Sequence, residues 1–150
     1  MTVELTPAER DLLFAERRAV LATINERGTA RLVPIAYAPV LDDGLRVYSA
    51  LDEKPKSVSD PRDLARVRDI RERPRVTLLV DRWDETWSAL AWLRMDGTAT
   101  LIEATDTAAG GHSDAVRLLR ERYPQYATHA LEQRPVIRID VDHVASWFAS

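Results

Sequence analysis

The chain is built from short apolar segments that are separated by tight turns. Arg18–Ile24 is apolar on both alternating faces, which predicts a strand buried on both sides. The Asn25–Gly28 turn follows and closes a hairpin, its glycine supplying a positive φ. The returning strand is predicted at Thr29–Val40, and an Asp42–Gly44 turn leads to the next strand at Leu45–Leu51.

The second half of the chain repeats this pattern with helices between the strands. Strands are predicted at Arg75–Val80, Ala89–Ile102, Pro135–Val141 and, after an Asp142–His143 turn, Val144–Phe148. Helices are predicted from the Thr6 cap to about Arg17, over Pro61–Arg73, and over Ser113–Arg122. Strict alternation of strand and helix is missing. We therefore expect a mainly β fold over residues 1–150: one domain, an antiparallel six- to seven-stranded barrel with peripheral helices.

Composition excludes several classes of site. The chain has 150 residues and no cysteine, so disulfides and thiolate ligands are excluded. Its three histidines, His112, His129 and His143, lack the spacing of metal ligands. No apolar run reaches the ~20 residues of a membrane span, and the N-terminal segment lacks the order of a signal peptide. We expect a soluble, cytoplasmic protein with no metal and no membrane partner.

The sequence contains no self-sufficient catalytic set. A Ser-His-Asp order, a nucleophile elbow, a Walker loop and a GxGxxG motif are all missing. No catalytic residue is therefore assigned. If the protein is an enzyme, a bound cofactor must supply the reaction.

Positive charge is concentrated between Lys54 and Arg75. This segment holds eight Lys or Arg against four Asp or Glu, a net charge of +4, so the rest of the chain carries −7. A local cationic segment on an acidic protein predicts a site for an anion rather than a nucleic-acid surface. The alternative is that the arginines lay their stems on apolar surface and keep their charges in water.

Helical periodicity places these arginines around a core stripe of Leu64, Val67 and Ile70. Arg71 falls inside the stripe and Arg68 beside it, while Arg66 points more nearly to the open side.

Two further features can be explained with or without a ligand. Pro34 lies in the middle of a strand, which requires a sheet edge or a bulge, and bulges often accompany ligand sites. Trp83 and Trp87 lie in a polar loop, where a second subunit, a ligand or their own barrel must cover them. The residues alone leave these alternatives open.

The chain resembles the FMN-binding split β-barrel superfamily of pyridoxamine-5′-phosphate oxidase-like proteins, and most of all its F420-dependent flavin/deazaflavin oxidoreductase branch. The resemblance covers nearly the whole chain. It rests on the order and spacing of six segments: Arg31–Tyr37, Val47–Ala50, the Lys-Pro-Lys loop at 54–56, Arg73–Val76, the Trp-Leu-Arg-x-x-Gly strand at 92–97, and Trp147.

The resemblance implies cofactor contacts at numbered positions. Val33, Pro34 and Ile35 match the flavin-contacting strand, and Tyr48 and Ser49 match a phosphate-binding pair. Arg66 replaces the family's helix lysine, and Trp92 replaces a polar residue that contacts the flavin ring. Arg66 keeps the charge but departs from the family's FMN-phosphate geometry, and Trp92 counts against ordinary FMN oxidase chemistry. The tail that binds pyridoxal phosphate in the true oxidases is missing, so we do not expect vitamin B6 oxidation. The cations Lys54, Lys56, Arg66 and Arg68 suit the phosphate and polyglutamate tail of F420.

These resemblances imply an F420-binding oxidoreductase that passes a hydride between the deazaflavin and a small, electron-poor organic substrate. They also imply a homodimer with the cofactor sites between its subunits. The first alternative is an FMN-dependent oxidoreductase of the same fold. The second is a non-catalytic carrier of a flavin, a deazaflavin or haem.

Overall fold

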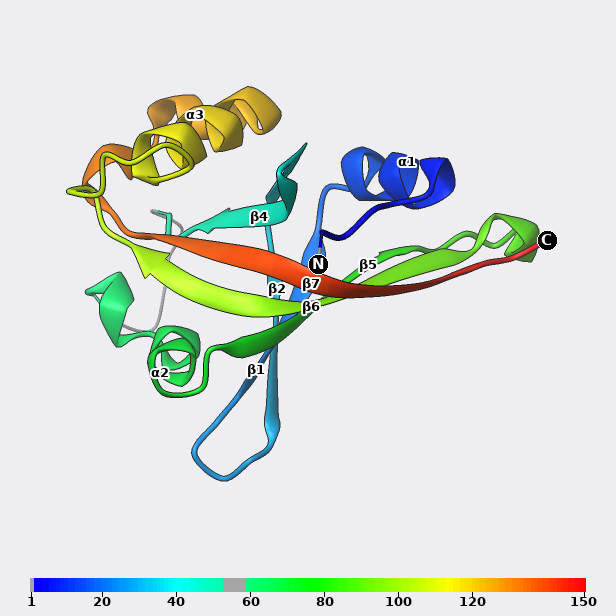
Figure 1. Ribbon diagram of the computed structural model, residues 1–150, viewed down its shortest axis with the longest axis horizontal. Helices are drawn as coiled ribbons and strands as arrows, with labels where there is room; N and C mark the ends of the chain where they lie inside the picture. The colour runs from blue at the N-terminus through cyan, green and yellow to red at the C-terminus, as the bar shows by residue number, and fades with distance from the viewer. Residues whose placement is uncertain (1, 53–58) are drawn as a thin grey trace.

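A computed structural model describes residues 2–52 and 59–150, so Lys54 and Lys56 lie outside the described residues. Seven strands form one antiparallel sheet in the order β2-β1-β5-β6-β7-β4-β3, which confirms the mainly β prediction (Figure 1). Their bounds are β1 Ala19–Ile24, β2 Ala30–Ile35, β3 Ala38–Asp42, β4 Gly44–Ala50, β5 Arg75–Arg82, β6 Ala91–Ile102 and β7 Val136–Phe148.

The two edge strands of the sheet, β2 and β3, are consecutive in the chain. The prediction of one strand at Thr29–Val40 is wrong, because the chain breaks at Ala36 and Tyr37 and its two halves lie at opposite edges. A tertiary contact accompanies the break: the Tyr37 backbone N–H donates to the hydroxyl of Tyr123 (2.9 Å) instead of to a neighbouring strand. The Ser49 hydroxyl in β4 donates to the Ala36 carbonyl (2.9 Å), which holds the end of β2 beside β4 and closes the barrel.

A long antiparallel pair of β6 and β7, joined through the α3 segment, forms the middle of the sheet (Figure 1). The predicted turn at Asp142–His143 is wrong, because β7 runs unbroken through it. Pairing continues through a bulge in β7: Asp96 pairs with His143 and Gly97 with Val141, so Asp142 is the extra residue and the register shifts where a turn was expected. A Cβ at Gly97 would lie 2.4 Å from the Asp140 carbonyl oxygen, so only glycine allows this close approach.

Three α-helices lie around the barrel: α1 Pro7–Ala15, α2 Ala65–Glu72 and α3 His112–Arg122 (Figure 1). The predicted capping box of α1 is confirmed by reciprocal hydrogen bonds between Thr6 and Glu9, although the helix ends before Arg17. A 3₁₀ turn at Pro61–Asp63 precedes α2, so the α-helix begins later than predicted. No helix within the described residues is long and apolar enough to cross a membrane.

The core lies inside the barrel. Leu64, Val67 and Ile70 of the α2 segment are buried in it, which confirms the predicted stripe. Arg71 was expected within the same sector but is exposed, because it lies at the edge of that sector, where a long charged side chain extends into water. A second apolar cluster packs α3 against β3 and β4. β4 is thus covered on both sides.

Candidate functional site

The end of β2 lies beside the end of β4, and we call this place the seam. Pro34 is exposed there and pairs with Val20 of β1, which confirms that it lies in an edge strand. Its neighbours point inward: Val33 packs partly against the core and Ile35 is buried. Of the three residues predicted to contact a flavin, the structure exposes only Pro34 on the outer face of the sheet.

Tyr48 and Ser49 lie beneath the seam rather than on its surface. Both are buried, and the Tyr48 hydroxyl donates to the carbonyl of Gly110 (2.6 Å). Burial raises the pKa of Tyr48, and the nearby Arg46 opposes that change. The Ser49 hydroxyl therefore bonds across the seam and the Tyr48 hydroxyl ties β4 to the segment before α3, and their role as phosphate ligands stays a prediction.

Arg66 is the half-buried cation next to the seam. The prediction that Arg68 lies beside the core stripe and Arg66 toward the open side is wrong, because the structure buries part of Arg66 and exposes Arg68. Burial lowers the pKa of Arg66, and the charge of Asp52, just beyond β4, opposes this. Tertiary packing against the end of β4 thus decides which arginine faces the protein.

One nitrogen of Arg66 lacks a hydrogen bond. Its Nε is buried and has no acceptor among the described residues. An unmatched buried donor on a charged group is costly, and an anionic ligand group that accepts from it would remove that cost. The donor set at the seam therefore fits a phosphate or carboxylate.

A buried carboxylate joins α2 to the strand that carries Pro34. Asp69 accepts hydrogen bonds from Thr23 Oγ1 of β1 (2.7 Å) and from Arg31 Nε of β2 (2.8 Å). Burial alone would raise the pKa of Asp69, but the bonds from Arg31 and Thr23 and the charges of Arg31 and Arg73 outweigh it and hold the pKa below its usual value. Asp69 therefore fixes α2, and with it Arg66, relative to β2.

A row of side chains runs from the seam across the outer face of the sheet. Pro34 pairs with Val20, Val20 with Leu79, and Leu79 with Arg94. Neighbouring strands are about 4.8 Å apart, so Leu79 lies roughly 10 Å from Pro34. Trp92 follows on the same face, two residues before Arg94 along β6. The structure thus brings the predicted Pro34 and Trp92 onto one continuous surface.

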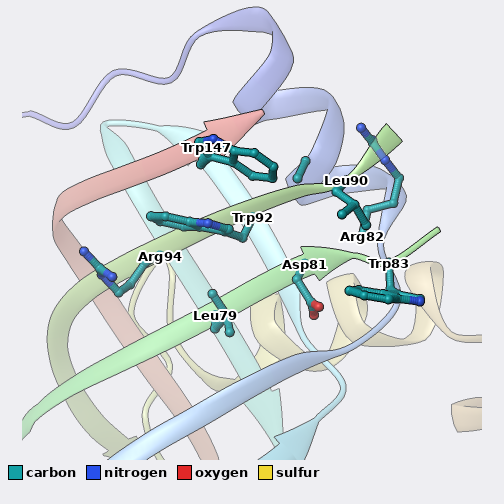
Figure 2. Close-up of a pocket in the computed structure, with 9 residues that line it drawn as sticks. Leu79, Asp81, Arg82, Trp83, Leu90, Trp92, Arg94 and Trp147 are labelled. Carbon is teal, nitrogen blue, oxygen red and sulfur yellow. The ribbon is translucent and has the colours of Figure 1, made fainter. Parts of the chain in front are cut away.

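This surface ends in a pocket of about 410 Å³ over β5, β6 and β7 (Figure 2). Trp92 and Trp147 are cross-strand partners and their indoles lie next to each other. Asp81 lies between Trp92 and Trp83 in the view of Figure 2. The full lining is Leu79, Asp81, Arg82, Trp83, Leu90, Ala91, Trp92, Arg94 and Trp147.

Two guanidinium groups and one carboxylate line the pocket. The Arg94 guanidinium lies 5.2 Å from the centre of the Trp92 ring, a cation–π contact. Arg82 Nε donates to the Ala89 carbonyl (2.6 Å) and so anchors the loop that carries Trp83. Among the described residues, neither arginine forms an ion pair with a carboxylate. The pocket therefore carries an excess of one positive charge.

Sequence reasoning identified part of this pocket. The alternation of residues along β6 places Trp92 and Arg94 on one face, and Leu90, just before the strand, lines the same pocket. Asp81 and Arg82 were not predicted, since they lie at a strand end where alternation gives no direction. Trp147 was noted only through the family resemblance, and its place beside Trp92 follows from the strand register.

Comparison with known proteins identifies the fold family. The family model described as Pyridoxamine 5′-phosphate oxidase matches residues 5–148. No curated protein matches the chain. The conserved hypothetical protein Rv2991 from Mycobacterium tuberculosis has a similar structure, with a TM-score of 0.71 and 22% identity over 97% of this chain and 86% of that one.

Two other solved structures have names that mention a ligand. A FAD-binding protein from Mesorhizobium loti has a TM-score of 0.63 and 22% identity over 97% of this chain and 96% of that one. HutZ, the heme storage protein from Vibrio cholerae, has a TM-score of 0.64 and 15% identity over 97% of this chain and 95% of that one. At these identities the likeness concerns the fold alone.

Proposed function

The chain belongs to the pyridoxamine 5′-phosphate oxidase family, and from that premise we propose that it is an oxidoreductase that binds a flavin-type cofactor, F420 in preference to FMN. The observation that carries the proposal is the half-buried Arg66 near Asp52 at the end of β4, whose Nε lacks an acceptor among the described residues. A cofactor with an anionic tail and a planar ring matches both this donor and the apolar face next to it.

The anionic tail would lie at the α2 side of the seam. Arg66 would donate to a tail oxygen, and Asp69 would keep the helix in position through its bonds to β1 and β2. Arg68, exposed on α2, and the sequence-predicted Lys54 and Lys56 would add charge. F420 carries more negative charge than FMN, so a set of four cations favours it.

The ring would lie on the outer face between Pro34 and Trp92. Val20 and Leu79 form the apolar floor of that surface, and Trp92 offers an aromatic face at its far end. When bound, F420 or FMN would supply the hydride-transfer chemistry that the chain's own side chains lack. The protein's part is to hold the ring, exclude water from one side of it, and fix its orientation toward a small, electron-poor organic substrate.

A second copy of the chain would cover the other side of the ring. Leu32, Leu79 and Trp147 are large apolar residues exposed on the outer face, at 65%, 36% and 47% of their surface. Such a surface is typical of an interface. A homodimer with a cofactor between its subunits would bury both the apolar residues and the ring.

Two alternatives keep the same site. FMN would use the same seam with a shorter tail. A non-catalytic carrier of a flavin, a deazaflavin or haem is favoured by the similarity to the FAD-binding protein and to the heme storage protein HutZ. Turnover with a panel of electron-poor substrates separates an oxidoreductase from a carrier.

Fluorescence titration of the full chain with F420 and with FMN tests the proposal. We expect tight F420 binding and at least about a tenfold weaker affinity for FMN. The double variant Lys56→Ala/Arg66→Ala should weaken F420 binding by about tenfold or more, since a hydrogen bond to a charged group contributes about 1.5–3 kcal/mol. Its affinity should also depend less steeply on salt, because fewer charges contact the tail.

Arg27→Ala is the matched control. Arg27 is an exposed arginine in the turn between β1 and β2, so its removal lowers the net charge by one, as the single variant Arg66→Ala does, but leaves the seam intact. Equal affinity of the wild type and the double variant would reject the anion site. FMN binding more tightly than F420 would favour the FMN alternative.

A further inference from the structure

We propose that the pocket formed by Trp83, Trp92 and Trp147 binds a planar aromatic carboxylate and, resting on the proposed function, that such anions are the substrate class presented to the cofactor. The inference draws on three properties of the pocket: its aromatic walls, its excess positive charge and the rigid loop that holds one wall.

The walls of the pocket suit a flat ring. Trp92 and Trp147 come from paired positions of β6 and β7, while Trp83 comes from the loop after β5. Leu79 and Leu90 complete an apolar lining. Aromatic side chains stack on planar rings with a preferred offset or edge-to-face geometry, and a saturated ring of equal volume gains less from them. A volume of about 410 Å³ lies within the range of small-molecule sites.

The charges of the pocket select an anion. Arg82 and Arg94 face a single carboxylate, Asp81, and neither arginine has a carboxylate ion-pair partner in the described part of the chain. A guanidinium group can bind a carboxylate through two parallel hydrogen bonds. A cationic ligand would be repelled by the excess positive charge, and a neutral one would form no ion pair with the guanidinium groups.

The loop that carries Trp83 is fixed by its own hydrogen bonds. Arg82 Nε bonds the Ala89 carbonyl at the far end of the loop (2.6 Å), and the Asp84 carboxylate accepts from the Thr86 backbone N–H (2.7 Å). Trp83 is nevertheless 67% exposed. A large apolar side chain held in water by an ordered loop is positioned for a ligand rather than for the core.

Trp87 provides a matched control within the same loop. It is 68% exposed, almost equal to Trp83, but it does not line the pocket. Replacing either tryptophan by alanine removes the same exposed surface, so a difference in ligand binding between the two variants reports the pocket alone.

Calorimetric titration of the full chain tests the inference with three probes: 2-naphthoate, its saturated analogue decahydro-2-naphthoate, and neutral 2-naphthalenemethanol. We expect 2-naphthoate to bind at least about tenfold more tightly than either other probe. Trp83→Ala should weaken 2-naphthoate binding by about tenfold, since it removes one aromatic contact with the ring. Trp87→Ala should bind like the wild type, and Arg94→Gln should bind the acid and the alcohol with nearly equal affinity.

Three results would overturn the inference: no binding of 2-naphthoate to the wild type, equal binding of the saturated acid, or equal losses in Trp83→Ala and Trp87→Ala. Circular dichroism confirms that each variant is folded. F420 titration of Trp83→Ala keeps the two proposals apart. If Trp83→Ala binds F420 like the wild type but no longer binds 2-naphthoate, the pocket assignment is supported. If the wild type does not bind F420, the proposed function is rejected, and the 2-naphthoate titration alone decides the pocket assignment.

Discussion

Alternate residues of β6 point to opposite sides of the sheet: Leu93 is fully buried in the core, whereas Trp92 and Arg94 lie on the outer face. Removing an outer side chain therefore affects ligand contact more than packing. This separation was predictable, because the period of two in the sequence fixes which residues share a face.

Trp92→Ala should weaken F420 binding by about tenfold or more while lowering the free energy of unfolding by only about 1 kcal/mol. Fluorescence titration and urea denaturation measure the two effects. Leu93→Ala is the control for packing and should cost about 3 kcal/mol of stability, because it opens a cavity in the core. A Trp92→Ala variant that binds F420 like the wild type would argue against ring contact at this position.

The burial of Tyr48 and Ser49 could not be predicted in the same way. Four consecutive residues of β4, Val47–Ala50, are all buried, since the barrel core covers one face and the α3 layer the other. Alternation disappears in such a strand, and the sequence gives no sign of which hydroxyl is internal. The Nε of Arg66, which has no acceptor among the described residues, could not be predicted from the sequence either, because its burial depends on packing at the end of β4.

At the scale of elements, Asp69 determines how α2 sits on the sheet. In the sequence it is one acid among several arginines, and such a residue is usually solvated. In the structure it is 2% exposed and bonds two strands. The helix and its apolar stripe were predictable from periodicity, whereas the polar contacts that fix its position depend on strands brought together from elsewhere in the chain.

Asp69→Asn should lower the free energy of unfolding at pH 7 by about 2 kcal/mol, since one charge of a buried ion pair is lost. The pKa of Asp69 is lowered in the folded state, so the carboxylate stabilises the fold fully above its ordinary pKa of about 4 and loses this effect as pH falls through the lowered value. The difference in the free energy of unfolding between Asp69→Asn and the wild type should therefore shrink below pH 4. Urea denaturation at pH 7 and at pH 3 measures it.

Asp11→Asn is the control for Asp69→Asn, because Asp11 is an exposed acid on α1. Its effect should be within about 0.5 kcal/mol at both pH values. If the difference in the free energy of unfolding between Asp69→Asn and the wild type stayed constant from pH 7 to pH 3, the predicted pH dependence would be contradicted.

At the scale of the whole molecule, turn positions and the family resemblance were enough to predict a mainly β barrel with peripheral helices. They were not enough to predict its closure. The chain leaves one edge of the sheet at Ala36 and enters the other at Ala38, a crossing set by the contacts of Tyr37 with Tyr123 and with the Leu13 carbonyl. These contacts join residues 24 and 86 positions apart in the chain, and such contacts leave no local pattern.

The barrel has a covered side and an open one. Helices and the second apolar cluster cover β3 and β4, whereas the outer face of β2, β1, β5, β6 and β7 carries exposed Leu32, Leu79 and Trp147. The seam and the tryptophan pocket both lie at this open face. One surface therefore combines the proposed cofactor site, the proposed substrate pocket and the proposed subunit interface.

A crystal structure of the protein with bound F420 tests this arrangement most directly. The account predicts that the anionic tail accepts a hydrogen bond from Arg66, that the ring lies on the outer face between Pro34 and Trp92, and that a second copy of the chain closes over it. A tail bound away from α2, or a ring on any other face of the barrel, would contradict it.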